Sequence, residues 1–175
     1  GVEYLASLCR ENGFPCAASR ELGGFHGPGR KDDCCPYATL IMADLMAQIP
    51  EYRDTSAAAS SAEALLSLWE NSREQHPYIF YMGDDFRKLK APSLWYDLLS
   101  VAAVLSRFPR VHADPRFQEM IGLIKSKGDE EGFFTPESVY LKLKAWDFGQ
   151  KKTPSPYLTY LCLRVFDRVE QGAGL

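Results

Sequence analysis

The chain has 175 residues, 46% of them hydrophobic and 25% charged, and its formal charge at pH 7 is −3. This length can bury the core of one domain and does not require a second. The slight acidity, without a long basic stripe, excludes a general nucleic-acid-binding protein, and no apolar run approaches the ~18 residues of a membrane span. Five cysteines without a short-spaced disulfide framework favour a reducing, cytoplasmic location.

Apolar residues at helical spacing predict three helices in the first half of the chain. The first covers residues 2–11 and ends at an Asn-Gly turn, which supplies a left-handed stop. A glycine-rich loop follows over residues 14–33. The second helix covers residues 36–48, with proline in its first turn, and the third covers about residues 55–73, with Thr55 as its cap.

The second half of the chain predicts three further helices and no sheet. Residues 78–81 could form one short extended piece, but a single strand has no partner. The fourth helix is predicted over residues 93–107 and is apolar nearly all round, which is typical of a buried helix. The fifth covers residues 115–127 and the sixth residues 156–170, and each follows a capping residue and a first-turn proline.

Two short sequence patterns recur with a period near sixty residues. One begins at Glu3, Glu63 and Glu119, at offsets of 60 and 56 (63 − 3 and 119 − 63). The other lies between these copies and begins at Cys35, Ser93 and Ser155, at offsets of 58 and 62 (93 − 35 and 155 − 93). Each copy must bury its apolar stripe against a neighbour, so the patterns predict a repeated helical hairpin. The fold class expected is all-α, with three hairpins in one domain over residues 1–175 and with inner and outer helices forming part of an α/α toroid.

The ends of the chain lead to a further expectation. The sequence starts almost directly within a helical pattern, without a leader, so we expect a fragment of a longer protein. The first and last helices carry few polar residues that could cover an end of a repeat array. We therefore expect association with a second copy or with a missing half of the toroid.

The loop before the second helix resembles a known family. Gly23-Gly24-Phe25-His26-Gly27, followed by Asp32-Asp33-Cys34 and then Tyr37, resembles the glycine-rich turn and inner-helix start of protein prenyltransferase β subunits. Squalene and terpenoid cyclases have the same hairpin repeat, and residues 131–159 look like an uncharacterised bacterial branch of that superfamily. Because full toroids of this family hold about six hairpins, the resemblance implies half a ring here. A shared fold does not by itself carry function.

The resemblance also implies a possible metal site. In the prenyltransferases, an Asp and a Cys two residues apart bind zinc together with a His on an inner helix. Asp32 and Cys34 match that pair, as do Asp33 and Cys35, but the inner-helix His is missing. His26 is the candidate that could replace it, and Cys16 could also contribute. We expect the vicinal cysteines to be structural and no cofactor to be bound, with zinc at Asp32, Cys34 and His26 or a redox role for the cysteine pair as alternatives.

Aromatic residues recur where the inner helices are predicted to start, with small polar groups nearby. They can line a shared cavity or serve as packing residues of the hairpin, and the catalytic residues, if there are any, are not identifiable because the Asp-rich acid motif of the cyclases is absent. The candidate cavity-lining residues are Tyr37, Thr39, Trp95, Tyr96, Asp97, Tyr157 and Thr159.

The function favoured by the sequence is a helical-repeat module whose concave, aromatic-lined inner face binds an apolar ligand or a partner segment, without catalysis. One alternative is an isoprenoid-handling enzyme, similar to a protein prenyltransferase or a terpene cyclase, with a degenerate metal site. The other is a structural or assembly half of a toroid.

Overall fold

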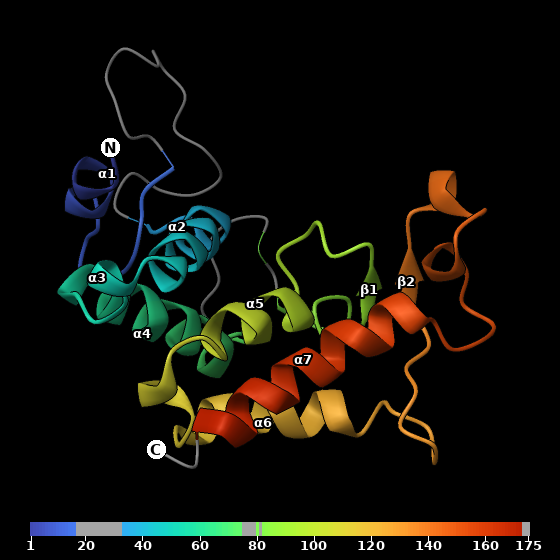
Figure 1. Cartoon of the computed structure of the whole chain (residues 1–175). Helices are drawn as coiled ribbons and strands as arrows, with labels where there is room; N and C mark the ends of the chain where they lie inside the picture. Colours follow the sequence, from blue (N-terminus) through green and yellow to red (C-terminus); the bar gives the residue numbers. More distant parts are fainter. Residues whose placement is uncertain (17–32, 75–79, 81, 173–175) are drawn as a thin grey trace. The chain divides into compact units, whose positions relative to one another are not determined.

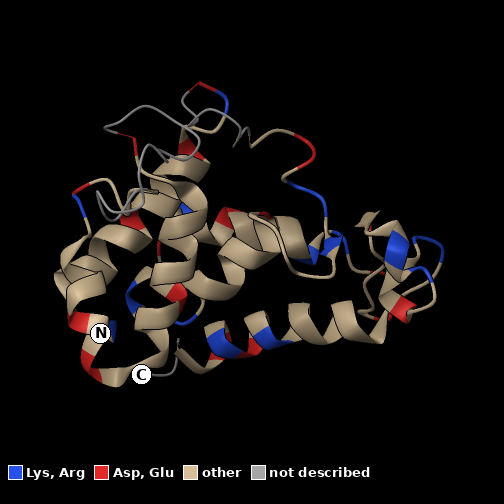
Figure 2. Ribbon diagram, turned by 90° about the horizontal axis from the view of Figure 1, so that it is seen from above, with Lys and Arg blue, Asp and Glu red and all other residues tan. Residues whose placement is uncertain are grey.

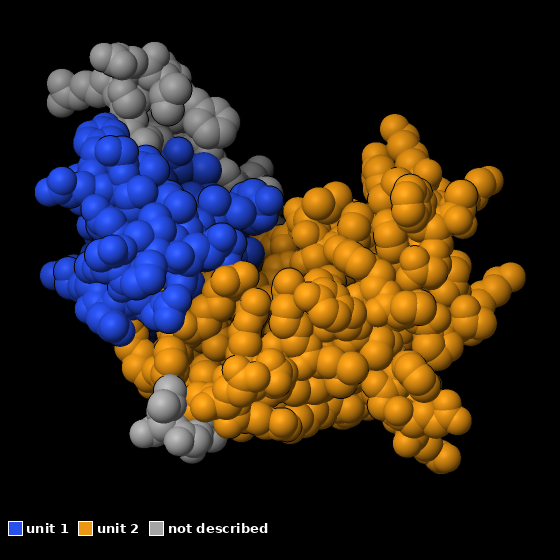
Figure 3. All heavy atoms as spheres, in the orientation of Figure 1, with its two compact units in different colours: residues 1–83 blue, residues 84–175 orange. Residues whose placement is uncertain are grey.

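The computed structural model describes residues 1–16, 33–74, 80 and 82–172. The chain divides into two compact units, residues 1–83 (unit 1) and residues 84–175 (unit 2), which are coloured separately in Figure 3. Both units contain fully buried apolar side chains. The described part of both is mainly helical, which confirms the predicted class. None of the helices in the described ranges has the length and apolarity needed to cross a membrane.

Unit 1 is built around α2 and α4, which pack against each other (Figure 1). The core between them contains Ala43 and Met46 from α2 and Leu65, Leu66 and Trp69 from α4. The shorter α3 packs on α2, and α1 lies against α4. The helices of this unit are α1 (Val2–Ser7), α2 (Pro36–Gln48), α3 (Pro50–Arg53) and α4 (Ser56–Glu70).

The starts of α2 and α4 follow from local sequence. In α2 the proline at the first helical position has no N–H to satisfy, and the Cys35 side chain accepts a hydrogen bond from the N–H of Ala38. In α4 the Thr55 side chain accepts from the N–H of Ala58, as the sequence predicts, and the alanines of the first turn favour the helix.

The first helix is shorter than predicted, because it ends at Ser7 and not at residue 11. Arg10 and Gly13 exchange two backbone hydrogen bonds, of 2.9 and 3.1 Å, in a tight turn. Those backbone groups therefore cannot continue the helix. The predicted stop at the glycine is real, but the turn that it makes begins three residues earlier.

Unit 2 is centred on the buried α5, which packs against both α6 and α7 (Figure 1). Two short strands, β1 and β2, pair in parallel, with Lys90 opposite Ser138 and Ala91 opposite Val139. They bring the residues before α5 alongside the residues after α6. The elements are β1 (Lys90–Ala91), α5 (Leu98–Leu105), η2 (Pro109–Val111), α6 (Pro115–Lys125), β2 (Ser138–Val139), η3 (Leu141–Leu143), η4 (Asp147–Gly149) and α7 (Pro156–Gly172).

Two expectations for unit 2 are wrong. The sequence predicts no sheet, and one two-residue parallel pair is present. The apolar pattern predicts that the fourth helix starts at Ser93, but it starts at Leu98 after an extended Asp97, whose carboxylate accepts the N–H of Ser100 at 2.8 Å. Aspartate is among the best capping residues, so it fixes the helix start despite the apolar residues before it.

Candidate functional site

The start of α2 forms a hydrogen-bonded junction with the chain segment that follows α1. The buried Phe14 donates its N–H to Thr39 Oγ1 at 2.9 Å and accepts at its carbonyl from the N–H of Cys35 at 2.7 Å. Cys35 Sγ in turn accepts from the N–H of Ala38 at 3.4 Å. The junction therefore satisfies backbone groups that the end of the loop and the first turn of α2 would otherwise leave unpaired.

The start of α7 has the same junction in unit 2. Phe134 donates its N–H to Thr159 Oγ1 at 3.0 Å and accepts from the N–H of Ser155 at 2.9 Å. Ser155 Oγ accepts from the N–H of Leu158 at 3.2 Å. Each of the three contacts has its counterpart in unit 1 at an offset of 120 residues (159 − 39 = 120), twice the period read from the sequence.

The start of α5 has a similar hydrogen bond to a phenylalanine carbonyl, but the donor is a different residue and the threonine is absent. The Phe86 carbonyl accepts an N–H at 3.1 Å, but from Leu98, and Val101 occupies the place of the threonine. The capping residue is Asp97, so Asp97 corresponds to Cys35 and Ser155, and not to the two threonines with which the sequence pattern aligns it. The capping residue of α5 therefore lies four residues after Ser93, the residue that the sequence pattern aligns with Cys35 and Ser155 (97 − 93 = 4).

Asp97 is only 1% exposed, and this burial raises the pKa of its carboxyl group to about 6. The hydrogen bond from the N–H of Ser100 to Oδ1 opposes the shift, and Oδ2 is buried without a partner among the described residues. Asp97, Thr39 and Thr159 are among the candidate cavity-lining residues. Each is buried, and each holds a backbone N–H close to a helix start.

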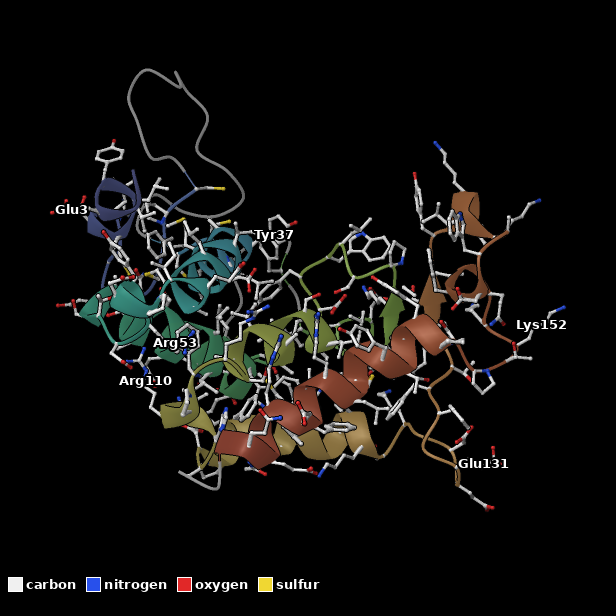
Figure 4. The ribbon with its side chains drawn as sticks, viewed as in Figure 1. Glu3, Tyr37, Arg53, Arg110, Glu131 and Lys152 are labelled. Atoms are coloured by element: carbon white, nitrogen blue, oxygen red, sulfur yellow. The ribbon has the colours of Figure 1, made fainter. Side chains whose placement is uncertain are left out.

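The candidate aromatic residues lie nearer the surface. Tyr37 is exposed at the start of α2 (Figure 4), and Tyr96 lies 5.4 Å from the ring of Phe86. Trp95 contacts Tyr140 edge-on, with 6.4 Å between the ring centroids. Tyr157 meets Phe148 at 4.8 Å, and Phe148 stacks on Trp146 at 5.7 Å.

Trp95, Tyr140 and Trp146 are among the exposed large side chains of unit 2, and together with two exposed leucines they form what we call the aromatic surface. The β1–β2 pair brings its two halves together, residues 94–95 from before α5 and residues 140–146 from after β2. Leu141 is 75% exposed and Trp146 is 61% exposed. The aromatic surface consists of Leu94, Trp95, Tyr140, Leu141 and Trp146.

Positive charge accompanies this surface. Residues 138–153 contain four lysines and one aspartate, a formal charge of +3 (4 − 1), in a chain whose total is −3. All four lysines are exposed; they appear as blue stretches in Figure 2, and Lys152 points away from the ribbon in Figure 4. The single acid, Asp147, already accepts a hydrogen bond from Ser155 Oγ at 2.6 Å. The four lysines are Lys142, Lys144, Lys151 and Lys152.

An open cleft of about 590 Å³ in unit 2 is also lined by three lysines, of which Lys88 is paired with Asp85 at 3.4 Å. Glu137 is its one acid and is held in place, because its carboxylate accepts from the N–H of Leu89 at 2.7 Å and from Lys127 Nζ at 2.8 Å. The lining is Lys88, Lys127, Thr135, Pro136, Glu137 and Lys151, so the walls carry a net charge of +2 (3 − 1).

The cysteines of unit 1 form a separate group. Cys16 Sγ donates to Cys35 Sγ across 3.3 Å, and the neighbouring Cys34 is buried. Burial raises the pKa of the Cys16 and Cys34 thiols to about 11. Two of the three candidate zinc ligands, His26 and Asp32, lie outside the described residues. Within the described part of the chain, no three His, Cys, Asp or Glu side chains are grouped so that they could hold a metal ion.

No family model, curated protein or solved structure matches the chain.

Sequence reasoning missed two of these features. The aromatic surface takes most of its members from residues 140–146, for which the sequence predicts no helix or strand, although their Tyr, Leu and Trp residues between lysines are a visible signal. The pairing of Cys16 with Cys35 has no local signal, since these residues are nineteen apart in sequence.

Proposed function

We propose that the protein is a helical-repeat binding module, and that its aromatic surface docks the apolar side chains of an acidic segment of a partner polypeptide. The observation that carries the proposal is the contrast within unit 2. Its core residues, such as Leu98, Phe117 and Leu158, are completely buried, whereas the five large side chains of the aromatic surface are between 36% and 75% exposed. Two of the five, Trp95 and Tyr140, are in direct contact. Contiguous exposed apolar groups on an otherwise well-packed protein are typical of interaction sites.

The chemistry of the surface favours a polypeptide partner. Tryptophan and tyrosine bury a large area at a small entropic cost and are enriched among the residues that dominate binding energy. Trp95, Tyr140 and Trp146 provide such groups, and Leu141 is the most exposed of the five.

The charges favour an acidic partner. The four exposed lysines of residues 138–153 are complementary to carboxylates, and they would increase the association rate at low ionic strength. Lys151 also lines the cleft, whose other two lysines are already paired with Asp85 and Glu137. The proposal therefore predicts binding that weakens as salt is added.

The α/α toroid remains part of the proposal as the architecture that would present this surface. Its support is the recurrence of one junction at the starts of α2 and α7, because repeat arrays reuse the same hairpin contacts.

The test uses a fluorescent peptide that alternates leucine and glutamate, titrated with the whole chain and followed by anisotropy. The control peptide carries lysine in place of glutamate. We expect the acidic peptide to bind and the basic one to fail. The variant Leu141→Ser/Trp146→Ala should weaken binding on the order of tenfold or more, as for two central anchors. The matched control, Ile41→Ser, removes an exposed apolar side chain of unit 1 and should leave binding unchanged.

Other results would overturn the proposal. Equal binding of the two peptides would show that charge plays no part, and no binding at all would remove the polypeptide partner. Association with phosphatidylserine vesicles but not with peptide, lost in Leu141→Ser/Trp146→Ala, would assign the surface to an anionic membrane instead.

A further inference from the structure

Two of the three thiols near the start of α2 lie close enough to each other to suggest disulfide chemistry, which the proposed binding function does not require. Cys16 and Cys35 come from segments on either side of residues 17–34, yet their sulfur atoms lie 3.3 Å apart. A disulfide bond is about 2.0 Å long, so the two sulfur atoms must approach by roughly a further 1.3 Å for the bond to form.

The backbone around the pair is already fixed. The N–H of Cys35 bonds to the carbonyl of Phe14, two residues before Cys16, and the N–H of Phe14 bonds to Thr39. The junction therefore holds both chain segments side by side whether or not the sulfur atoms are joined.

We propose that Cys16 and Cys35 form a reversible disulfide that covalently closes the start of α2 in unit 1. The corresponding positions in unit 2, 120 residues later, are Pro136 and Ser155, which cannot form such a bond. The same junction is thus redox-active in one unit and inert in the other.

The oxidant that we name is a small-molecule disulfide of the glutathione class. The Cys16 thiol, which is less buried than that of Cys35, loses its proton and attacks one sulfur of the oxidant, forming a mixed disulfide and releasing one thiolate. Cys35, after losing its proton, attacks Cys16 Sγ, so that the protein disulfide forms and the second thiolate leaves. The two released thiolates take up the two protons. The protein pair is oxidised by two electrons, and the small disulfide is reduced to two thiols.

The test is incubation of the whole chain with oxidised glutathione, followed by intact mass measurement and peptide mapping. We expect the mass to fall by two hydrogen atoms, a peptide linking Cys16 to Cys35, and full reversal by dithiothreitol. The oxidised chain should also show a higher thermal unfolding midpoint, because the bond closes a loop in the unfolded chain.

The variants distinguish this pair from the adjacent one. Cys35→Ser reproduces the cap found in unit 2 and should abolish the bond without loss of fold, whereas Cys34→Ser should leave it intact. A bond between Cys34 and Cys35, a bond that persists in Cys35→Ser, or glutathione that stays attached without forming an internal bond would each overturn the proposal.

Discussion

The two junctions that begin α2 and α7 are alike in backbone hydrogen bonding and different in the atom that caps the helix. In both, a buried phenylalanine is held by a threonine of the helix and by the N–H of the capping residue. The cap is a thiol in unit 1 and a hydroxyl in unit 2. The contact between the phenylalanine and the threonine is therefore common to both helix starts, whereas the capping side chain can differ in its chemistry.

The largest loss of stability is expected at Gly13, which directly precedes Phe14 of the unit 1 junction. Gly13 has φ of +104°, and a Cβ there would lie 2.7 Å from Thr39 Oγ1, the acceptor of the Phe14 N–H. Gly13→Ala should therefore strain the backbone and displace that acceptor, lowering the free energy of unfolding by about 4 kcal/mol. Denaturant unfolding in urea measures the loss.

Gly132, two residues before Phe134, is the control because it also has a positive φ. Its φ is +84°, but a Cβ there would meet nothing within 4 Å. Gly132→Ala should cost only the backbone strain, about 1–2 kcal/mol. Equal losses for the two alanine variants would contradict the close contact at Gly13.

Asp97 is a carboxylic-acid cap at the start of α5, whereas the starts of α2 and α7 are capped by a thiol and a hydroxyl. Its pKa is about 6 in the folded protein, against about 3.9 unfolded. A raised folded pKa means that the stabilising contribution is complete below about pH 4 and is lost as pH rises through 6, a change of up to about 3 kcal/mol.

Asp97→Asn keeps a good capping residue and removes the titration. The variant should therefore lack this fall in stability between about pH 4 and pH 7. The measurement is the free energy of unfolding of both proteins across that pH range. Parallel pH profiles for Asp97→Asn and the natural chain would contradict a raised pKa for the buried Asp97 carboxyl group.

The threonines test whether the two junctions are energetically alike. Thr39→Val and Thr159→Val keep the shape of the side chain but leave a buried phenylalanine N–H without its acceptor. Each should cost about 2 kcal/mol. The exposed Thr153→Val serves as the control and should change stability little. A loss confined to one of the two buried threonines would show that the junctions are not equivalent.

The smallest effect is expected at the cap itself. Under reducing conditions, Cys35→Ser places the unit 2 capping residue in unit 1, and serine is a preferred capping residue. The free energy of unfolding should change by no more than about 1 kcal/mol. A larger loss would mean that the Cys35 thiol packs in a way that oxygen cannot replace.

How much of this could be predicted from the sequence depends on how local each cause is. The starts of α4 and α6 follow from Thr55 and from Asp114-Pro115, because capping acts within a few residues. The predicted start of α5 at Ser93 is wrong, because the Asp97 cap fixes the start at Leu98 despite the apolar residues before it. The aromatic surface depends on the pairing of β1 with β2, and the contact of Cys16 with Cys35 depends on the Phe14 junction. Neither can be read from a single segment.

Hydrogen exchange at the Phe14 and Phe134 amides tests the central claim, the shared junction, most directly. Both amides should be strongly protected in the native chain, with Thr39→Val accelerating exchange at Phe14 alone and Thr159→Val at Phe134 alone. Exchange of either amide at the rate of an unstructured chain would contradict the account.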